Sequence, residues 1–234
     1  MQVPPPDDPS LRRAVTLRRV DGTAWEVQAG GRRALLLGTV QGLLEESRRV
    51  LRAFDAFSPT AVALGVSEED LAWLGGEEPG WDEADWDMAP SEGGLLLQLG
   101  QFGEVAFPPP DLLAGLLEGK ARGLPVYALD LPEEAFAQAN LEFVETPALL
   151  RHALLTRRLV KEAPAAETAV DLCLAWAARL RAIPGYDELE REREGFMADR
   201  LLDLLEREAR VLAVVDVSAL AGVVAALREA PPDP

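Results

Sequence analysis

"RRALLLGTVQGLLEESRRVLRAF", residues 32–54, decides the fold because it predicts a buried strand, a tight turn and an amphipathic helix in direct succession. α/β proteins bind ligands at such junctions, since parallel strands open there and the helix presents unpaired N–H groups and a partial positive charge. Gln41 stands at this junction. A carboxamide does not titrate and is a poor metal ligand, which argues against an acid-base or metal site at this position.

The composition is that of a folded globular protein. The chain has 234 residues, of which 48% are hydrophobic and 27% charged, and this suits one domain with a full core. Its net charge of −17 repels phosphate backbones and anionic lipids, so we expect no nucleic-acid partner and no membrane partner.

Three features of the chain predict a soluble cytoplasmic protein. Residues 1–10 lack the apolar and basic pattern of a signal peptide, and no stretch reaches the ~20 consecutive apolar residues of a membrane span. The single cysteine, Cys173, excludes an intrachain disulfide and lies in an apolar helical stretch, where we expect a core thiol.

Hydrophobic periodicity outlines the whole domain. Alternating residues on either side of Asp21-Gly22 predict a β-hairpin. The apolar segments 33–38, 58–66, 124–131 and 210–217 predict buried strands, with Ser218 as the cap of a last helix. We therefore expect an α/β fold with a mixed, mostly parallel central sheet, an N-terminal β-hairpin, flanking helices and a helical insertion over about 133–209. This single domain should cover 15–229, between disordered tails at 1–14 and 230–234.

An acidic segment interrupts the pattern. "GGEEPGWDEADWDMAPSEGG", residues 75–94, combines terminal glycines, carboxylates and the tryptophans Trp81 and Trp86. Long segments without periodicity inside compact domains are either functional or disordered. The sequence leaves two interpretations open, a lid or a solvated loop.

Four separated stretches carry a family resemblance: "LLLGT" (35–39), "ESRRVLRAFDAFSPTAVAL" (46–64), "EREREGFMADRLLDLL" (190–205) and "VLAVVDVSALAGV" (211–223). Their order resembles the TraB/PrgY family, which includes the TIKI proteins and is related to the ChaN and erythromycin-esterase-like group. The most specific part is Glu192-Arg193-Glu194 followed by Phe196-Met197-Ala198, which is similar to the family's Glu-Arg-Asp-x-x-Met-Ala helix motif.

The sequence departs from the family at the residues that carry the family's chemistry. The family's first strand ends Gly-Thr-x-His, its second strand carries a glutamate, and its last strand ends Gly-x-Gly-His, and these polar residues form the metal or catalytic set of its hydrolases. Here Gly38-Thr39 and the trailing Gly222 are retained, whereas Gln41 and Ala219 stand at the histidine positions, Gly65 at the glutamate position and Asp216 at the glycine position. The resemblance therefore implies a degenerate enzyme with no catalytic residue, metal or cofactor.

Six residues form the candidate ligand-binding crevice: Gly38, Thr39, Gln41, Glu68, Arg193 and Asp216. Thr39 and Gln41 either donate hydrogen bonds to a ligand or cap the turn. Arg193 either binds an anion or pairs with a neighbouring acid, and Asp216 either accepts hydrogen bonds from adjacent N–H groups or has a raised pKa.

Three functions are compatible with this pattern. The first is a catalytically degenerate TraB-like domain that binds a small molecule or a partner protein and acts in binding or regulation. The second is a metal-dependent hydrolase, peptidase-like or esterase-like, whose carboxylates have moved to Asp216, Glu68 or Glu69 and the acidic segment. The third is a structural homodimer built on the helical insertion. Leu172, Trp176 and Leu180 recur on one helical side, which is either the dimer face or, more commonly for such a stripe, part of the core.

Overall fold

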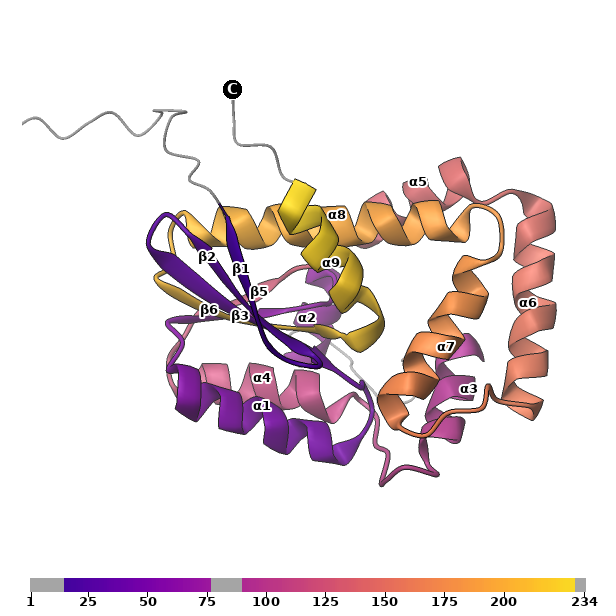
Figure 1. Cartoon of the computed structure of the whole chain (residues 1–234), viewed down its shortest axis with the longest axis horizontal. Coiled ribbons are helices and arrows are strands. Elements are labelled where there is room, and N and C mark those ends of the chain that lie inside the picture. Colours follow the sequence, from indigo (N-terminus) through magenta and orange to yellow (C-terminus); the bar gives the residue numbers. More distant parts are fainter. Residues whose placement is uncertain (1–14, 77–89, 230–234) are drawn as a thin grey trace, which may run out of the picture.

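The computed structural model describes residues 15–76 and 90–229, and it confirms the predicted α/β fold (Figure 1). Its strands are β1 (Thr16–Asp21), β2 (Ala24–Ala29), β3 (Arg32–Thr39), β4 (Ala61–Leu64), β5 (Val126–Ala128) and β6 (Arg210–Asp216). They form one mixed sheet in the order β1-β2-β3-β6-β4-β5. The first three pair antiparallel, and β3, β6, β4 and β5 pair parallel.

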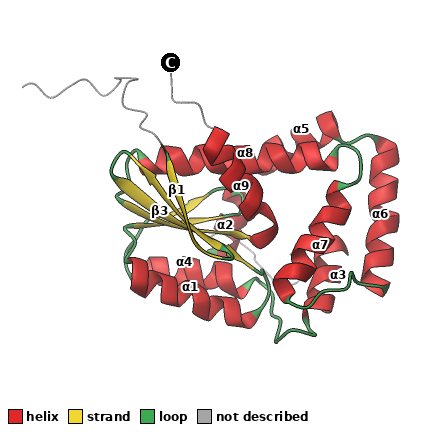
Figure 2. Cartoon of the chain, viewed as in Figure 1, coloured by secondary structure: helices red, strands yellow, loops and turns green. Residues whose placement is uncertain are grey.

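Helices cover both faces of this sheet (Figure 2). They are α1 (Leu44–Phe57), α2 (Glu68–Leu74), α3 (Pro90–Leu99), α4 (Pro110–Ala121), α5 (Glu133–Phe143), α6 (Thr146–Lys161), α7 (Ala169–Arg181), α8 (Tyr186–Leu205) and α9 (Val217–Glu229). Helices α5 to α8 are the predicted insertion between the last two strands. No helix within the described ranges is both long and apolar enough to cross a membrane.

Local sequence signals explain where several of these elements begin and turn. The β1-β2 hairpin turns at Asp21-Gly22, where the Asp21 carboxylate accepts the Thr23 N–H at 2.7 Å. Ser67 caps α2 by accepting the Asp70 N–H at 3.0 Å. Helix α3 was not predicted, because its first residues belong to the acidic stretch that the sequence assigned to a loop. Trp81 and Trp86 of that stretch, and both predicted tails, lie outside the described residues.

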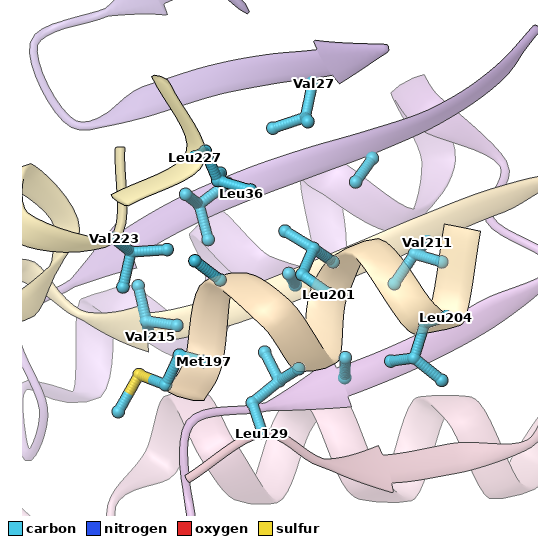
Figure 3. Close-up of a cluster of buried hydrophobic side chains, with 14 of the residues drawn as sticks. Val27, Leu36, Leu129, Met197, Leu201, Leu204, Val211, Val215, Val223 and Leu227 are labelled. Atoms are coloured by element: carbon cyan, nitrogen blue, oxygen red, sulfur yellow. The ribbon is translucent and has the colours of Figure 1, made fainter. Parts of the chain in front are cut away.

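The hydrophobic core has one layer on each face of the sheet. On one face α8 and α9 cover β3 and β6, where Leu36, Leu201, Val215 and Val223 are buried together (Figure 3). On the other face α1 and α4 pack against the same strands. Side chains alternate between the two faces along each strand, and the continuous apolar runs of β3 and β6 are the expected sequence pattern of strands buried on both faces.

The central position of β6 creates the feature on which the site depends. The chain leaves the end of β3 toward α1 on one face, and it leaves the end of the adjacent β6 toward α9 on the other face. Two neighbouring parallel strands whose connections diverge define a topological switch point, where open α/β sheets bind ligands. The residues at this point are Thr39 and Asp216, which are paired in register.

The apolar stripe on α7 is part of the core, which was one of its two interpretations. Leu172 and Trp176 are only 0% and 3% exposed, while Leu180 is half-buried. A Cβ atom at Gly94 of α3 would lie 3.4 Å from the Trp176 ring, so this tryptophan packs against the helix that the sequence did not predict. Leu172 and Trp176 are therefore core residues and cannot form a dimer face.

Candidate functional site

The candidate site lies at the carboxyl ends of β3, β6 and β5. We name it the strand-end site and define it as Thr39, Asp111, Asp130, Arg193 and Asp216. Thr39 and Asp216 end their strands, Asp130 follows β5, and Asp111 and Arg193 come from α4 and α8. Thr39, Arg193 and Asp216 were predicted to lie together, whereas Asp111 and Asp130 were not predicted to belong to the site.

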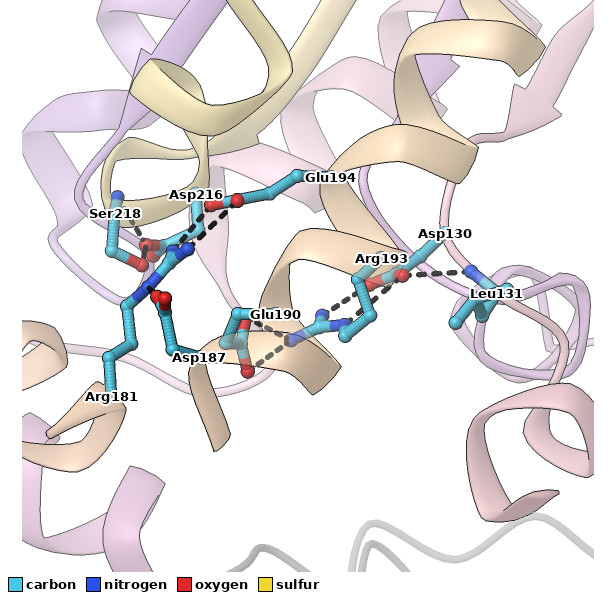
Figure 4. Close-up of polar contacts among 9 residues, drawn as sticks. All are labelled: Asp130, Leu131, Arg181, Asp187, Glu190, Arg193, Glu194, Asp216 and Ser218. Carbon is cyan, nitrogen blue, oxygen red and sulfur yellow. Dashed lines mark hydrogen bonds and ion pairs between the residues drawn. The ribbon is translucent and has the colours of Figure 1, made fainter. Parts of the chain in front are cut away.

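Asp216 begins α9 as well as ending β6. Its carboxylate accepts the Ser218 N–H at 2.7 Å and the Ser218 hydroxyl, so Asp216 rather than Ser218 caps this helix (Figure 4). Burial raises the pKa of Asp216, while the Ser218 hydrogen bonds and the Arg193 charge act in the opposite direction. The two alternatives posed by the sequence are therefore both present: hydrogen bonds from adjacent groups and a raised pKa.

Thr39 and Asp111 form a buried polar pair beneath this strand end. Both residues are 0% exposed, and the Thr39 hydroxyl lies 2.7 Å from Asp111 Oδ2 and 3.2 Å from the Val215 carbonyl oxygen. Asp111 Oδ1 is buried without a hydrogen-bond partner in the described part of the chain. Burial is the main reason that the pKa of Asp111 rises to about 6, and the negative charges of Asp216 and Glu46 add to the effect.

Arg193 pairs with acids, as one of the two interpretations of the sequence predicted. Its guanidinium donates through Nε to Asp130 Oδ1 at 3.2 Å and through Nη2 to Asp130 Oδ2, and Nη1 lies 3.1 Å from Glu190 Oε2 (Figure 4). Asp130 also accepts the Leu131 N–H at 2.8 Å. These bonds tie α8 to the end of β5.

A second arginine network lies beside the first. Arg181 of α7 forms a two-pronged pair with Glu194 of α8, with N···O distances of 2.6 and 3.0 Å, and also contacts Asp187 at 2.8 Å (Figure 4). Glu194 is only 2% exposed. A Cβ atom added at Gly222 of α9 would lie 1.9 Å from the Glu194 carboxyl carbon. Gly222 therefore lets this carboxylate lie directly against α9.

Gly38, Gln41 and Glu68 were also predicted to line the ligand-binding crevice, but they are not among the residues of the strand-end site. Gly38 precedes Thr39 in β3, and an added Cβ would approach Leu220 of α9 to 2.9 Å, so this glycine serves close packing. Gln41 is half-buried in the turn before α1. Glu68 is not part of the strand-end site, because its mostly exposed side chain pairs with Arg200 of α8 at 3.2 Å.

Cys173 and Gly65 are two positions at which the sequence predicted no catalytic role. Cys173 is 3% exposed, which confirms the predicted core thiol, and burial together with the charges of Asp216 and Glu46 raises its pKa. Gly65 follows β4, and a Cβ atom there would lie 3.1 Å from the Val215 Cα and 3.3 Å from the Val214 carbonyl oxygen. A larger side chain at Gly65 requires β6 to move.

The strand-end site carries an excess of negative charge. Asp111, Asp130 and Asp216 lie there with Glu190 beside them, and Arg193 faces these acids. No group of three histidine, cysteine, aspartate or glutamate side chains within residues 15–76 and 90–229 converges as metal ligands. The arrangement can therefore accept hydrogen bonds and hold a positive charge, but the described residues do not form a metal site.

Two cavities lie elsewhere on the molecule. One of about 160 Å³ is at the start of α1, lined by Leu43, Arg48 and Glu104 among others. Another of about 400 Å³ follows β5 and has Glu68 and Arg200 on its lining. The strand-end site is instead reached through its partly exposed members, Asp216 and Arg193, and through the adjacent Glu190. No protein-family model and no curated protein matches the chain.

Proposed function

We propose that the chain is a divergent TraB-like domain that acts as a binding or regulatory protein. The positions of the resemblance support this proposal: Thr39, Gly65 and Asp216 lie at the ends of adjacent parallel strands, and Arg193 reaches the same edge from α8. Gly222 also has a clear role here, because it accommodates the buried Glu194.

The ligand that fits the strand-end site is a small molecule or peptide end with a positively charged nitrogen. One observation carries this proposal: carboxylates surround the switch point, and Arg193 is already held by Asp130 and Glu190. The remaining negative charge is centred on Asp216, which is partly exposed and supported by Ser218. An ammonium or guanidinium group gains charge-assisted hydrogen bonds at such a carboxylate.

A metal-dependent hydrolase receives less support. That function needs Asp216 and Glu68 to converge with a further carboxylate, but Glu68 is paired with Arg200 and Asp216 with Ser218. The binding function needs only the charges that the strand-end site already has.

Ligand titrations test the proposed binding function directly. Spermidine, arginine and a short peptide with a free N-terminus are to be titrated calorimetrically and by thermal shift, with glutamate as the anionic control. We expect saturable binding of at least one cationic probe and none of glutamate. Failure of all three cationic probes to bind would overturn the proposal.

The variant Asp216→Asn should weaken binding of that probe by roughly 10-fold or more, because the charge is removed. Asparagine is as good a helix cap as aspartate, so the fold is retained. Asp55→Asn is the matched control, since Asp55 is an exposed residue of α1 that pairs with Arg122 at 2.7 Å and lies outside the strand-end site. Equal affinities of the Asp216→Asn variant and the control would place the ligand elsewhere.

A further inference from the structure

The outer face of α6 is an unusual surface in this protein because it exposes leucines. Leu150 and Leu154 are 65% and 56% exposed, and Leu149 beside them is 45% exposed. Leu141, at the end of the preceding α5, is 86% exposed. We name these four residues the leucine patch. Figure 1 shows α6 at the end of the helical insertion that is farthest from the sheet.

The opposite side of α6 already has its packing partners. Ala148, Thr156 and Leu159 are buried on that side, and α3 and α7 contact the helix there. Gln98 of α3 donates to the Val160 carbonyl oxygen at 2.8 Å. Rotating α6 to bury the leucine patch would therefore expose the side that already packs against α3 and α7.

Charges bracket the leucine patch at its two ends. Glu142 and Glu145 are exposed near the start of α6, and Arg157, Arg158 and Lys161 are exposed near its end. Arg151 is exposed between the leucines. Leu150, Leu154, Arg157 and Lys161 follow one another at spacings of four, three and four residues, so they form one stripe along the helix. Within the part of the chain that the structure describes, none of these six charged residues takes part in an ion pair.

We infer that the leucine patch is the interface of a symmetric dimer, with a second copy of this chain as the occupant. A two-fold axis through the middle of α6 makes the two helices antiparallel, so Leu150 of one copy lies opposite Leu154 of the other. The same axis brings the basic end of each α6 to the acidic end of its partner. The two ends of the patch are thus complementary in charge.

The size of this surface suits a weak dimer. Helix α6 has 16 residues and is about 24 Å long. One helix face of this length makes a small interface, at the weak end of the specific range. An anionic membrane is a poorer occupant, because the net charge of −17 opposes its approach.

Sedimentation equilibrium over a wide range of protein concentration tests the inference. We expect a concentration-dependent rise from the mass of one chain to that of two, and a chain that stays monomeric at the highest concentration overturns it. Leu150→Glu should weaken the dimer at least ~10-fold. Leu117→Glu is the control, because Leu117 is 60% exposed on α4 at a different surface and should leave the dimer unchanged.

A charge exchange separates the symmetric dimer from any other mode of association. Replacing Arg157 and Arg158 with glutamate should dissociate the dimer, since acids then face acids. Adding Glu142→Arg and Glu145→Arg to the same chain should restore it, because both ends are now reversed. An association that survives the first pair of changes, or that the second pair fails to restore, contradicts the proposed geometry. The readout is mass alone, so it is independent of ligand binding at the strand-end site.

Discussion

Replacing Gly222 with alanine is expected to lower the free energy of unfolding by about 3 kcal/mol. The new methyl group meets the Glu194 carboxylate, which is buried and held by Arg181. Either α9 moves away from α8, which opens the core, or Glu194 leaves its arginine, which strands a buried charge. For a chain of this length the loss corresponds to a fall in Tm of roughly 6–12 °C.

Gly195→Ala is the matched control for this experiment. Gly195 lies one residue after Glu194 in α8, and an added Cβ there has no other atom within 4 Å. Alanine favours the helix, so this variant should be about 0.5–1 kcal/mol more stable than the parent. Urea unfolding followed by circular dichroism measures both changes. If Gly222→Ala costs much the same in a Glu194→Ala background, the clash with this carboxylate is not its cause.

The variant Asp111→Asn is expected to stabilise the protein by about 2 kcal/mol at pH 7.5 and to have little effect near pH 4. The folded-state pKa of Asp111, about 6, lies above its ordinary value of 3.8. Between these values the folded state holds a proton that the unfolded state has released, so stability falls as the pH rises from about 4 through 6. The asparagine has no charge to bury and lacks this loss.

Unfolding free energies at pH 4, 5, 6 and 7.5 measure the difference between the two proteins. The parent should lose roughly 2–3 kcal/mol more than the Asp111→Asn variant over this interval. The Asp55→Asn control removes an exposed carboxylate and should follow the parent within ~0.5 kcal/mol. Parallel curves for the parent and the Asp111→Asn variant would mean that Asp111 titrates normally.

The sequence was most informative where a chemically unusual residue stands at the end of a clearly predicted element. Asp216 was found because a carboxylate ends an otherwise apolar strand, and the fold class followed from apolar runs and turn residues that act over a few positions. Asp130 carries the same signal as Asp216, since it follows the apolar residues of β5, but it was read as part of a longer strand. Searching every predicted apolar strand for a carboxylate at its end finds both residues.

Asp111 was not accessible to such reasoning. It contacts Thr39, which is 72 residues away in the chain, and the contact depends on where α4 packs against the sheet. Trp176 shows the same dependence on tertiary structure. Its stripe on α7 was compatible with a dimer face until α3, which the sequence did not predict, supplied an intramolecular partner. Periodicity identifies an apolar side of a helix but not what covers it.

The central place of β6 has a consequence for how the chain is made. Among the described strands β6 is synthesised last, yet it separates β3 from β4. A growing polypeptide on the ribosome can pair β1 with β2, β2 with β3, and β4 with β5. These two pieces share no strand contact until residues 210–216 emerge. Until then the edges of β3 and β4 expose unpaired backbone N–H and C=O groups. The nascent chain therefore depends on the late insertion of β6, or on a chaperone, to avoid pairing these edges with other chains.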